Sequence, residues 1–103
     1  MHAIVRRYEG VDASRTEELT KKVGEKFIPR LREMSGFNGY YLIQDGSGVM
    51  TSVSLFDTSA HADESTQLAS TWVRDEQLEK ALPNPPKITF GEVIAKSNGL
   101  AVA

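Results

Sequence analysis

The sequence predicts an α+β fold whose elements follow the order strand, helix, strand, strand, helix, strand. Apolar residues recur at helical spacing between positions 19 and 34, and a glycine-rich turn at 45–48 separates two segments of strand-like composition. A proline-rich segment at 83–86 then ends a second helical region before a last β-branched segment. This order is that of the ferredoxin-like arrangement, a four-stranded antiparallel sheet with two helices on one face.

The overall composition fits one small domain. The chain has 103 residues, of which 40% are hydrophobic and 25% charged. A net charge of -2 argues against nucleic acid or an anionic membrane surface as partner. The absence of cysteine excludes disulfides, thiolate nucleophiles and cysteine-ligated metals. We expect one domain over residues 1–96 and a loose tail over 97–103. No apolar run reaches the roughly 20 residues of a spanning helix, so we expect a cytoplasmic protein with no membrane partner.

The first third of the chain predicts a strand and an interrupted helix. Residues 3–8 are β-branched and apolar at their start, which is typical of a strand. Ser14 and Glu17 have the spacing of a capping box at a helix start. One helix face is then formed by Leu19, Val23, Phe27, Leu31 and Met34. Pro29 lacks an N–H and crowds the preceding turn, so we expect a kink between residues 24 and 29 or two short helices.

The rest of the chain predicts a hairpin, a second helix and a last strand. We expect strands over residues 37–44, 49–56 and 87–95. Capping residues at 57–59 begin a helix that runs through Trp72 and Val73, and the pattern leaves open whether it continues through Leu78 and Leu82. The prolines that follow forbid further helix.

Alternation along the hairpin distributes side chains over two sheet faces. With a loop of two or four residues, one face carries Asn38, Tyr40, Leu42, Thr51, Val53 and Leu55. The other face carries Phe37, Gly39, Tyr41, Ile43, Met50, Ser52, Ser54 and Phe56. Two helices cover only one face, and both faces are partly apolar. We therefore expect a homodimer in which a second copy of the chain packs sheet against sheet.

The segment from Pro29 to Tyr41, in which a helix end is followed by Gly-Phe-Asn-Gly and two tyrosines, resembles the helix-to-strand junction of antibiotic biosynthesis monooxygenase-like domains. The element order is similar over nearly the whole chain. The resemblance implies a dimeric α/β barrel with a pocket in each subunit between sheet and helices. It further implies a cofactor-independent monooxygenase-like protein that binds a small aromatic or hydrophobic molecule, with no cofactor.

Haem-degrading members of that family carry an Asn on the first strand and a Trp followed by a His on the second helix. Here the first strand has no Asn, and His61 precedes Trp72, which argues against haem degradation. Two isolated histidines without a carboxylate cluster also predict no metal site.

Six residues are candidates for ligand contact: Arg7, Phe37, Asn38, Tyr41, His61 and Trp72. Trp72 could wall an aromatic pocket or be an ordinary core residue. His61 could be a general base, because its pKa lies near neutrality, or an exposed residue of a first helical turn. Asn38 could hydrogen-bond a substrate oxygen or serve the turn.

Two further pairs of residues leave the direction of the pocket open. Tyr40 and Tyr41 point to opposite faces, and Tyr41 is the pocket candidate because we place Ser52 and Ser54 on its face. Arg6 and Arg7 also alternate, so one of them points inward, where a guanidinium could hold a carboxylate or phenolate.

Two other functions remain to be weighed. An RNA-recognition module shares the element order but needs exposed aromatics within a basic third strand, and residues 49–56 offer one aromatic at their end. A non-catalytic dimeric ligand-binding or regulatory domain is the alternative that the sequence leaves open.

Overall fold

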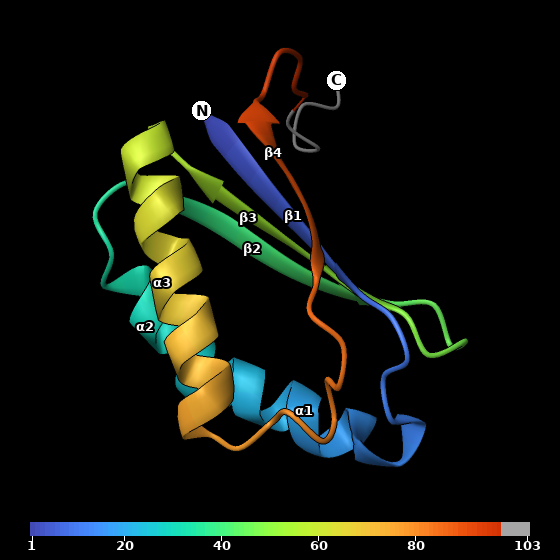
Figure 1. Cartoon of the computed structure of the whole chain (residues 1–103). Helices are drawn as coiled ribbons and strands as arrows, with labels where there is room; N and C mark the ends of the chain where they lie inside the picture. The colour runs from blue at the N-terminus through green and yellow to red at the C-terminus, as the bar shows by residue number, and fades with distance from the viewer. Residues whose placement is uncertain (98–103) are drawn as a thin grey trace.

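The structure is a computed structural model that describes residues 1–97. Its regular elements are β1 (His2–Tyr8), α1 (Thr16–Lys22), α2 (Ile28–Arg32), β2 (Phe37–Gln44), β3 (Met50–Phe56), α3 (Ser59–Asp75) and β4 (Lys87–Glu92) (Figure 1). The strands form one antiparallel sheet in the order β2-β3-β1-β4, with the helices on one face. The predicted fold class is confirmed. Apart from Ser97, the predicted tail lies outside the described residues.

The first helical region is interrupted where the sequence predicts it. Between α1 and α2 the chain forms a π-helical segment, Val23–Phe27, and Pro29 follows at the start of α2. The ring of Pro29 and its missing N–H prevent a regular α-helical bond to the preceding turn, and the wider π turn relieves that conflict. The apolar face continues through the break, because Leu19, Phe27 and Leu31 are all buried.

One predicted helix start is wrong, and a helix extension that the sequence left open is absent. Ser14 does not begin a capping box: Asp12 precedes a short 3-10 turn, Ala13–Arg15, and its Oδ1 accepts a hydrogen bond from the Ser14 backbone N–H at 3.0 Å. The 3-10 turn shifts the start of α1, so a carboxylate closer to the preceding loop takes the capping position. The later helix, α3, ends at Asp75 and does not continue to Leu78, because the chain reverses at Gln77, whose φ is 56°.

The predicted strand ends differ slightly from those observed. β3 starts at Met50, one residue later than predicted, and β4 ends at Glu92, short of the predicted Ala95. β4 is an edge strand that pairs only with β1 among the described strands. Its pairing ends where β1 ends, because His2 is the register partner of Glu92.

The register of the β2–β3 hairpin corrects the predicted sheet faces. Gln44 pairs with Met50, so the loop has five residues, 45–49, and Tyr40 and Leu42 lie opposite Ser54 and Ser52. A loop with an odd number of residues pairs each β2 residue with a β3 residue one position away from the partner that a two- or four-residue loop would give. Side chains predicted to share a face therefore lie on opposite faces. The placement of Tyr41 on the face of the two serines is therefore wrong.

The long loop has a local physical cause. Asp45 Oδ1 accepts a hydrogen bond from the backbone N–H of Ser47 at 2.8 Å. Gly46 and Gly48 both have positive φ, at 82° and 89°, which residues with a Cβ rarely adopt. These three residues together hold a wider reversal than a two-residue turn.

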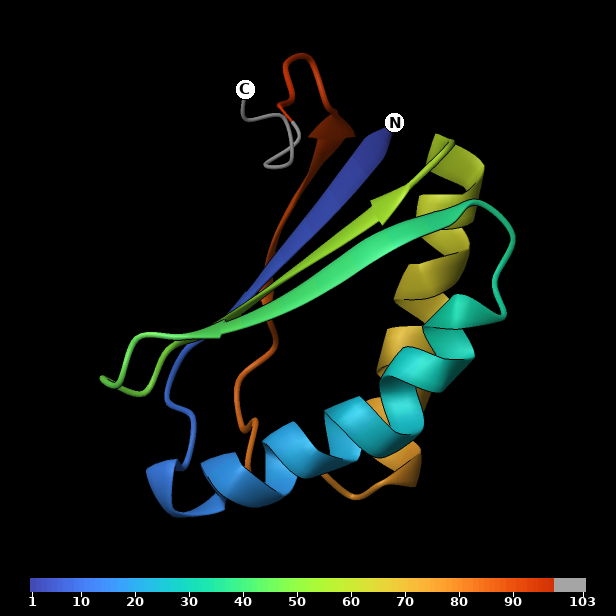
Figure 2. The same ribbon diagram turned by 180° about the vertical axis from the view of Figure 1, so that it is seen from behind.

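The helices leave one sheet face open, as Figure 2 shows from behind. We call this the outer sheet face; it carries Val5, Tyr41, Ile43 and Val53. Tyr41 and Ile43 are 62% and 53% exposed, whereas Ile4 and Phe56 on the helix-covered face are fully buried. No helix among the described residues is long and apolar enough to cross a membrane.

Gly36, between α2 and β2, should be intolerant of a side chain. Its φ is 76°, and a Cβ there would collide with the His61 ring. We expect Gly36→Ala to lower the free energy of unfolding by about 2–4 kcal/mol, the sum of left-handed strain and steric overlap. Urea denaturation would measure the change. Adding His61→Ala should restore only the steric part, and equal losses in both backgrounds would contradict this explanation.

Candidate functional site

Two adjoining chambers lie between the helices and the sheet. The inner chamber has a volume of about 40 Å³ and lies beneath the helices against the centre of the sheet. Its lining is mostly apolar and aromatic: Arg6, Tyr8, Leu19, Val23, Phe27, Tyr40, Leu42, Met50, Ser52, Ala69, Trp72, Val73 and Leu82. This volume accommodates one or two water molecules and excludes an aromatic ring.

The outer chamber has a volume of about 430 Å³ and adjoins solvent. It lies between α3, the edge strand β4 and the proline-rich connector that joins them, which Figure 1 shows standing away from α3. Its lining comprises Arg6, Tyr8, Thr66, Ala69, Ser70, Val73, Glu79, Leu82, Pro83, Asn84, Pro85, Pro86 and Ile88. Arg6, Tyr8 and Ala69 line both chambers, so the two chambers adjoin each other.

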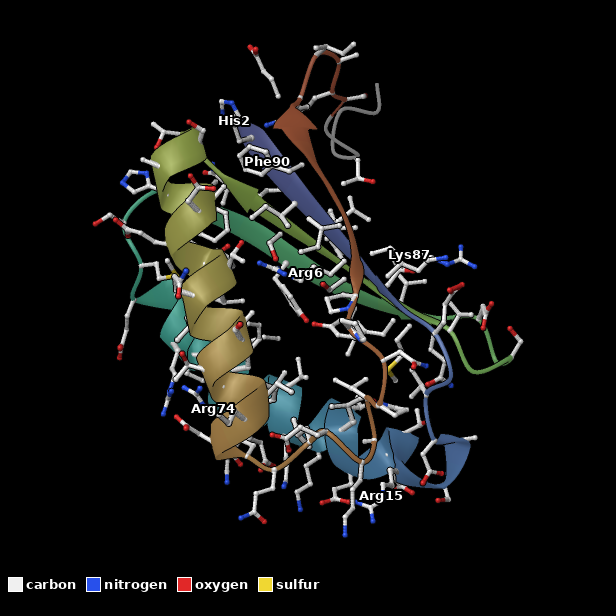
Figure 3. All side chains as sticks on the ribbon, in the orientation of Figure 1. His2, Arg6, Arg15, Arg74, Lys87 and Phe90 are labelled. Atoms are coloured by element: carbon white, nitrogen blue, oxygen red, sulfur yellow. The ribbon has the colours of Figure 1, made fainter. Side chains whose placement is uncertain are left out.

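Arg6 is the charged group at the junction of the chambers. It is 3% exposed, and Figure 3 shows its guanidinium in the space between α3 and the sheet. Its Nη2 donates a hydrogen bond to Thr66 Oγ1 on α3 at 3.0 Å. None of the ion pairs among residues 1–97 involves Arg6. Burial lowers the pKa of the guanidinium, and Tyr8 and Tyr40 oppose that shift.

Two tyrosine hydroxyls accompany this guanidinium. Burial raises the pKa of Tyr8, and Arg6 partly offsets that effect. Burial also raises the pKa of Tyr40 to about 12, with a further increase from Tyr8. Both phenols therefore stay protonated at neutral pH, where they can donate hydrogen bonds but cannot act as bases.

An aromatic cluster closes the inner chamber. The Phe27 ring lies 4.8 Å from Trp72 and 5.6 Å from Tyr40 between centroids. Trp72 is 3% exposed, and its indole Nε1 has no hydrogen-bond partner among the described residues. A buried N–H without a partner costs about 1–3 kcal/mol, which a water or ligand in the chamber would relieve. Among residues 1–97, no group of three acidic, histidine or cysteine side chains is placed to hold a metal.

Comparison with known proteins reveals the fold but no sequence relative. No protein-family model and no curated protein matches the chain. A protein of unknown function from Nitrosomonas europaea, NE2512, has a similar structure with a TM-score of 0.75 at 17% identity, over 97% of this chain and 95% of that one. The monooxygenase ActVA-Orf6 of Streptomyces coelicolor, solved with nanaomycin D, is similar with a TM-score of 0.68 at 16% identity, over 92% of each chain.

A third structure is a dimeric ferredoxin-like protein from an uncultured marine organism. It has a TM-score of 0.65 at 14% identity and covers 95% of this chain and 99% of that one. The chain has the antibiotic biosynthesis monooxygenase-like fold. Identities this low demonstrate the shared fold and leave the activity to be argued from the site.

Within this monooxygenase-like fold, the six predicted site residues separate into three groups. Trp72 lines the inner chamber. Arg7 and Tyr41 lie on the opposite side of the sheet: Arg7 is exposed, with its Nε 3.7 Å from Glu9 Oε1, and Tyr41 is exposed on the outer sheet face. The inward arginine of the pair is Arg6.

Phe37, Asn38 and His61 lie near Gly36, and none of them lines either chamber. Phe37 packs against Phe56, with ring centroids 5.7 Å apart. Asn38 Nδ2 donates a hydrogen bond to Asp57 Oδ1 at 2.8 Å, and His61 Nδ1 is 3.1 Å from the hydroxyl of its cap residue, Thr58. In the described structure these three side chains fix the junctions that lead into β2 and α3.

Because Arg6 has no acidic partner among residues 1–97, its effect on the free energy of unfolding can be predicted. Replacing Arg6 with the apolar Met of similar length removes a buried cation that lacks an acidic partner. We expect Arg6→Met to raise the free energy of unfolding by about 1–3 kcal/mol, because desolvating an unpaired charge costs more than one hydrogen bond returns. Urea denaturation at fixed protein concentration would measure this. A large loss of stability would instead make Arg6 a structural residue.

Proposed function

We propose that the protein binds a small aromatic or hydrophobic molecule in the joined chambers and acts on it as a cofactor-independent monooxygenase-like protein. One observation carries the proposal: an outer chamber of ligand size adjoins an inner chamber whose wall includes Phe27, Tyr40 and Trp72. Ligand pockets typically measure about 300–1,000 Å³ and combine apolar walls with a few polar groups. The outer chamber, at about 430 Å³, has these properties.

The sizes of the chambers orient the ligand. The inner chamber, at about 40 Å³, cannot receive a ring, so the body of the ligand lies in the outer chamber beside Ala69 and Val73. One edge of the ligand then faces the inner chamber and Trp72. The inner space accommodates a diatomic molecule such as oxygen at that edge.

The oxygenase part of the proposal is supported by the similarity to ActVA-Orf6 and by the lining of the inner chamber. An electron-rich aromatic ring can itself reduce oxygen: one oxygen atom bonds to a ring carbon, and the other leaves as water with the two hydrogens that the ring and its hydroxyl lose. The chain would contribute a dry, shaped space, and Tyr40 would donate a hydrogen bond from a phenol that stays protonated.

Ligand binding is testable through the chain's single tryptophan. Titration with 1-naphthol should quench Trp72 fluorescence in the wild type, because the ligand lies next to the inner chamber. Ala69→Leu should weaken binding at least about tenfold, since a larger side chain at the wall shared by both chambers fills the space. The exposed α3 substitution Gln67→Leu is the matched control and should bind normally.

Oxygen consumption with the same ligand separates the two functions. Uptake that accompanies formation of a naphthoquinone, and that falls in Ala69→Leu, supports the monooxygenase. Saturable binding without uptake favours a non-catalytic ligand-binding or regulatory domain. Failure of all aromatic ligands to bind at the chambers contradicts both.

We also propose that two copies pack through the outer sheet face. Tyr41 and Ile43 are apolar side chains more than half exposed on that face, and one structural neighbour is described as dimeric. Ile88 and Phe90 on β4 are register partners of Arg6 and Ile4, so they lie on the helix side of the sheet and are not part of this face. Exposed apolar side chains contiguous over a sheet are typical of a subunit interface.

The dimer is tested by a charge on that face. Ile43→Glu should convert a dimer to a monomer in sedimentation equilibrium, because two like charges would be buried at a symmetric contact. Gln67→Glu, a change at an exposed position on α3 away from the outer sheet face, should leave the dimer intact. A monomeric wild type would overturn the proposal.

A further inference from the structure

Arg6 is built into the chamber wall in a way that folding does not explain. It is only 3% exposed, and within the described residues its guanidinium makes one hydrogen bond, from Nη2 to Thr66. A guanidinium carries five N–H donors, so the bond to Thr66 leaves most of them available beside the chambers that Arg6 lines. Buried charges are ordinarily paired, and an isolated one costs several kcal/mol.

The position of Arg6 makes these donors available to a ligand. Arg6 lines both chambers, so a molecule in the outer chamber meets it before reaching Trp72. Thr66 lines the outer chamber and accepts from Arg6, which orients the guanidinium and leaves the threonine's own proton free to be donated. A planar guanidinium fixed in this way matches the two oxygens of a carboxylate, or the adjacent oxygens of an enolate.

We propose that the ligand is an anion: a planar aromatic molecule whose oxyanion is bound by Arg6 where the two chambers meet. This inference rests on the proposed ligand-binding function and adds the charge of the ligand and the residue that recognises it. The oxyanion supplies the counter-charge that Arg6 lacks among residues 1–97, and the aromatic body occupies the outer chamber.

The surrounding charges favour a contact at Arg6 over a general attraction. Glu79 is the carboxylate residue in the lining of the outer chamber; it is exposed and forms no ion pair with Arg6. The nearby Lys87 is 75% exposed and is 3.1 Å from Glu9, which offsets its charge. With a net charge of -2, the chain as a whole does not attract anions. Selectivity for an anion would therefore come from Arg6.

The test compares ligands of the same shape and different charge. The first pair is 2-naphthoate and neutral 2-naphthamide, and the second is 2-hydroxy-1,4-naphthoquinone, ionised at neutral pH, and its 2-methoxy ether. Isothermal titration calorimetry on the wild type should show at least about tenfold tighter binding of the anion in one pair or both, the effect of a charge-assisted hydrogen bond. The pair that responds distinguishes a carboxylate from an enolate.

Substitutions then assign the preference to Arg6. Arg6→Met should abolish it, Arg6→Lys should retain part of it, and Arg74→Met should preserve it, because Arg74 is exposed at the end of α3 and points away from the chambers (Figure 3). Circular dichroism would confirm that each variant is folded. A preference that survives in Arg6→Met overturns the assignment.

Two results on the wild type keep the proposal falsifiable even if the variants are unstable. Affinity for the anion should fall little in about 0.5 M sodium chloride, since a buried charge is screened far less than a surface one. A steep fall would locate the anion on surface cations and overturn the inference. Equal binding of neutral and anionic ligands would overturn it while leaving the proposed function in place, whereas no binding of any probe would count against both.

Discussion

The five-residue loop between β2 and β3 decides which side chains face the helices and which face away. Because Gln44 pairs with Met50, Tyr40 and Ser52 point toward the helices and Tyr41 points outward. A loop shorter by one residue would exchange the two sets, since a slip of one position moves every side chain to the other face. The lining of the inner chamber and the apolar outer sheet face therefore have one common cause.

The space between sheet and helices remains open because α3 covers only part of the sheet. Ala62, Ser65 and Ala69 are buried small residues on α3 and allow it to lie close to β1 and β3. The proline-rich connector then extends from the α3 end to β4 without packing into the gap, and Asn84 ties it to the Glu9 carbonyl at 3.0 Å. Stiff prolines keep this wall extended, so the outer chamber is preformed.

Local signals identified nearly all of the fold. Periodicity, Pro29 and the glycine-rich turn have effects that act within a few residues, so strands and the helix break were predicted close to their observed positions. The site was harder, because Arg6 and Arg7 look alike in sequence and only strand direction separates them. The assumed loop of two or four residues placed Tyr41, instead of Tyr40, on the sheet face of Ser52 and Ser54. For Trp72 the sequence left a pocket wall and a core position open, and the residue both lines the inner chamber and is buried in the core.

Arg6 and Trp72 are both buried side chains at the chambers whose N–H groups a ligand could use. Each is 3% exposed. Trp72 Nε1 has no hydrogen-bond partner among the described residues, and Arg6 uses one of its donors for Thr66. Folding alone favours apolar residues at such positions, because an unpaired buried donor lowers stability. A ligand in the space between them would give these donors partners. A bound anion with an aromatic body would be stabilised by the protein and would in turn stabilise its fold, by the linkage between binding and unfolding.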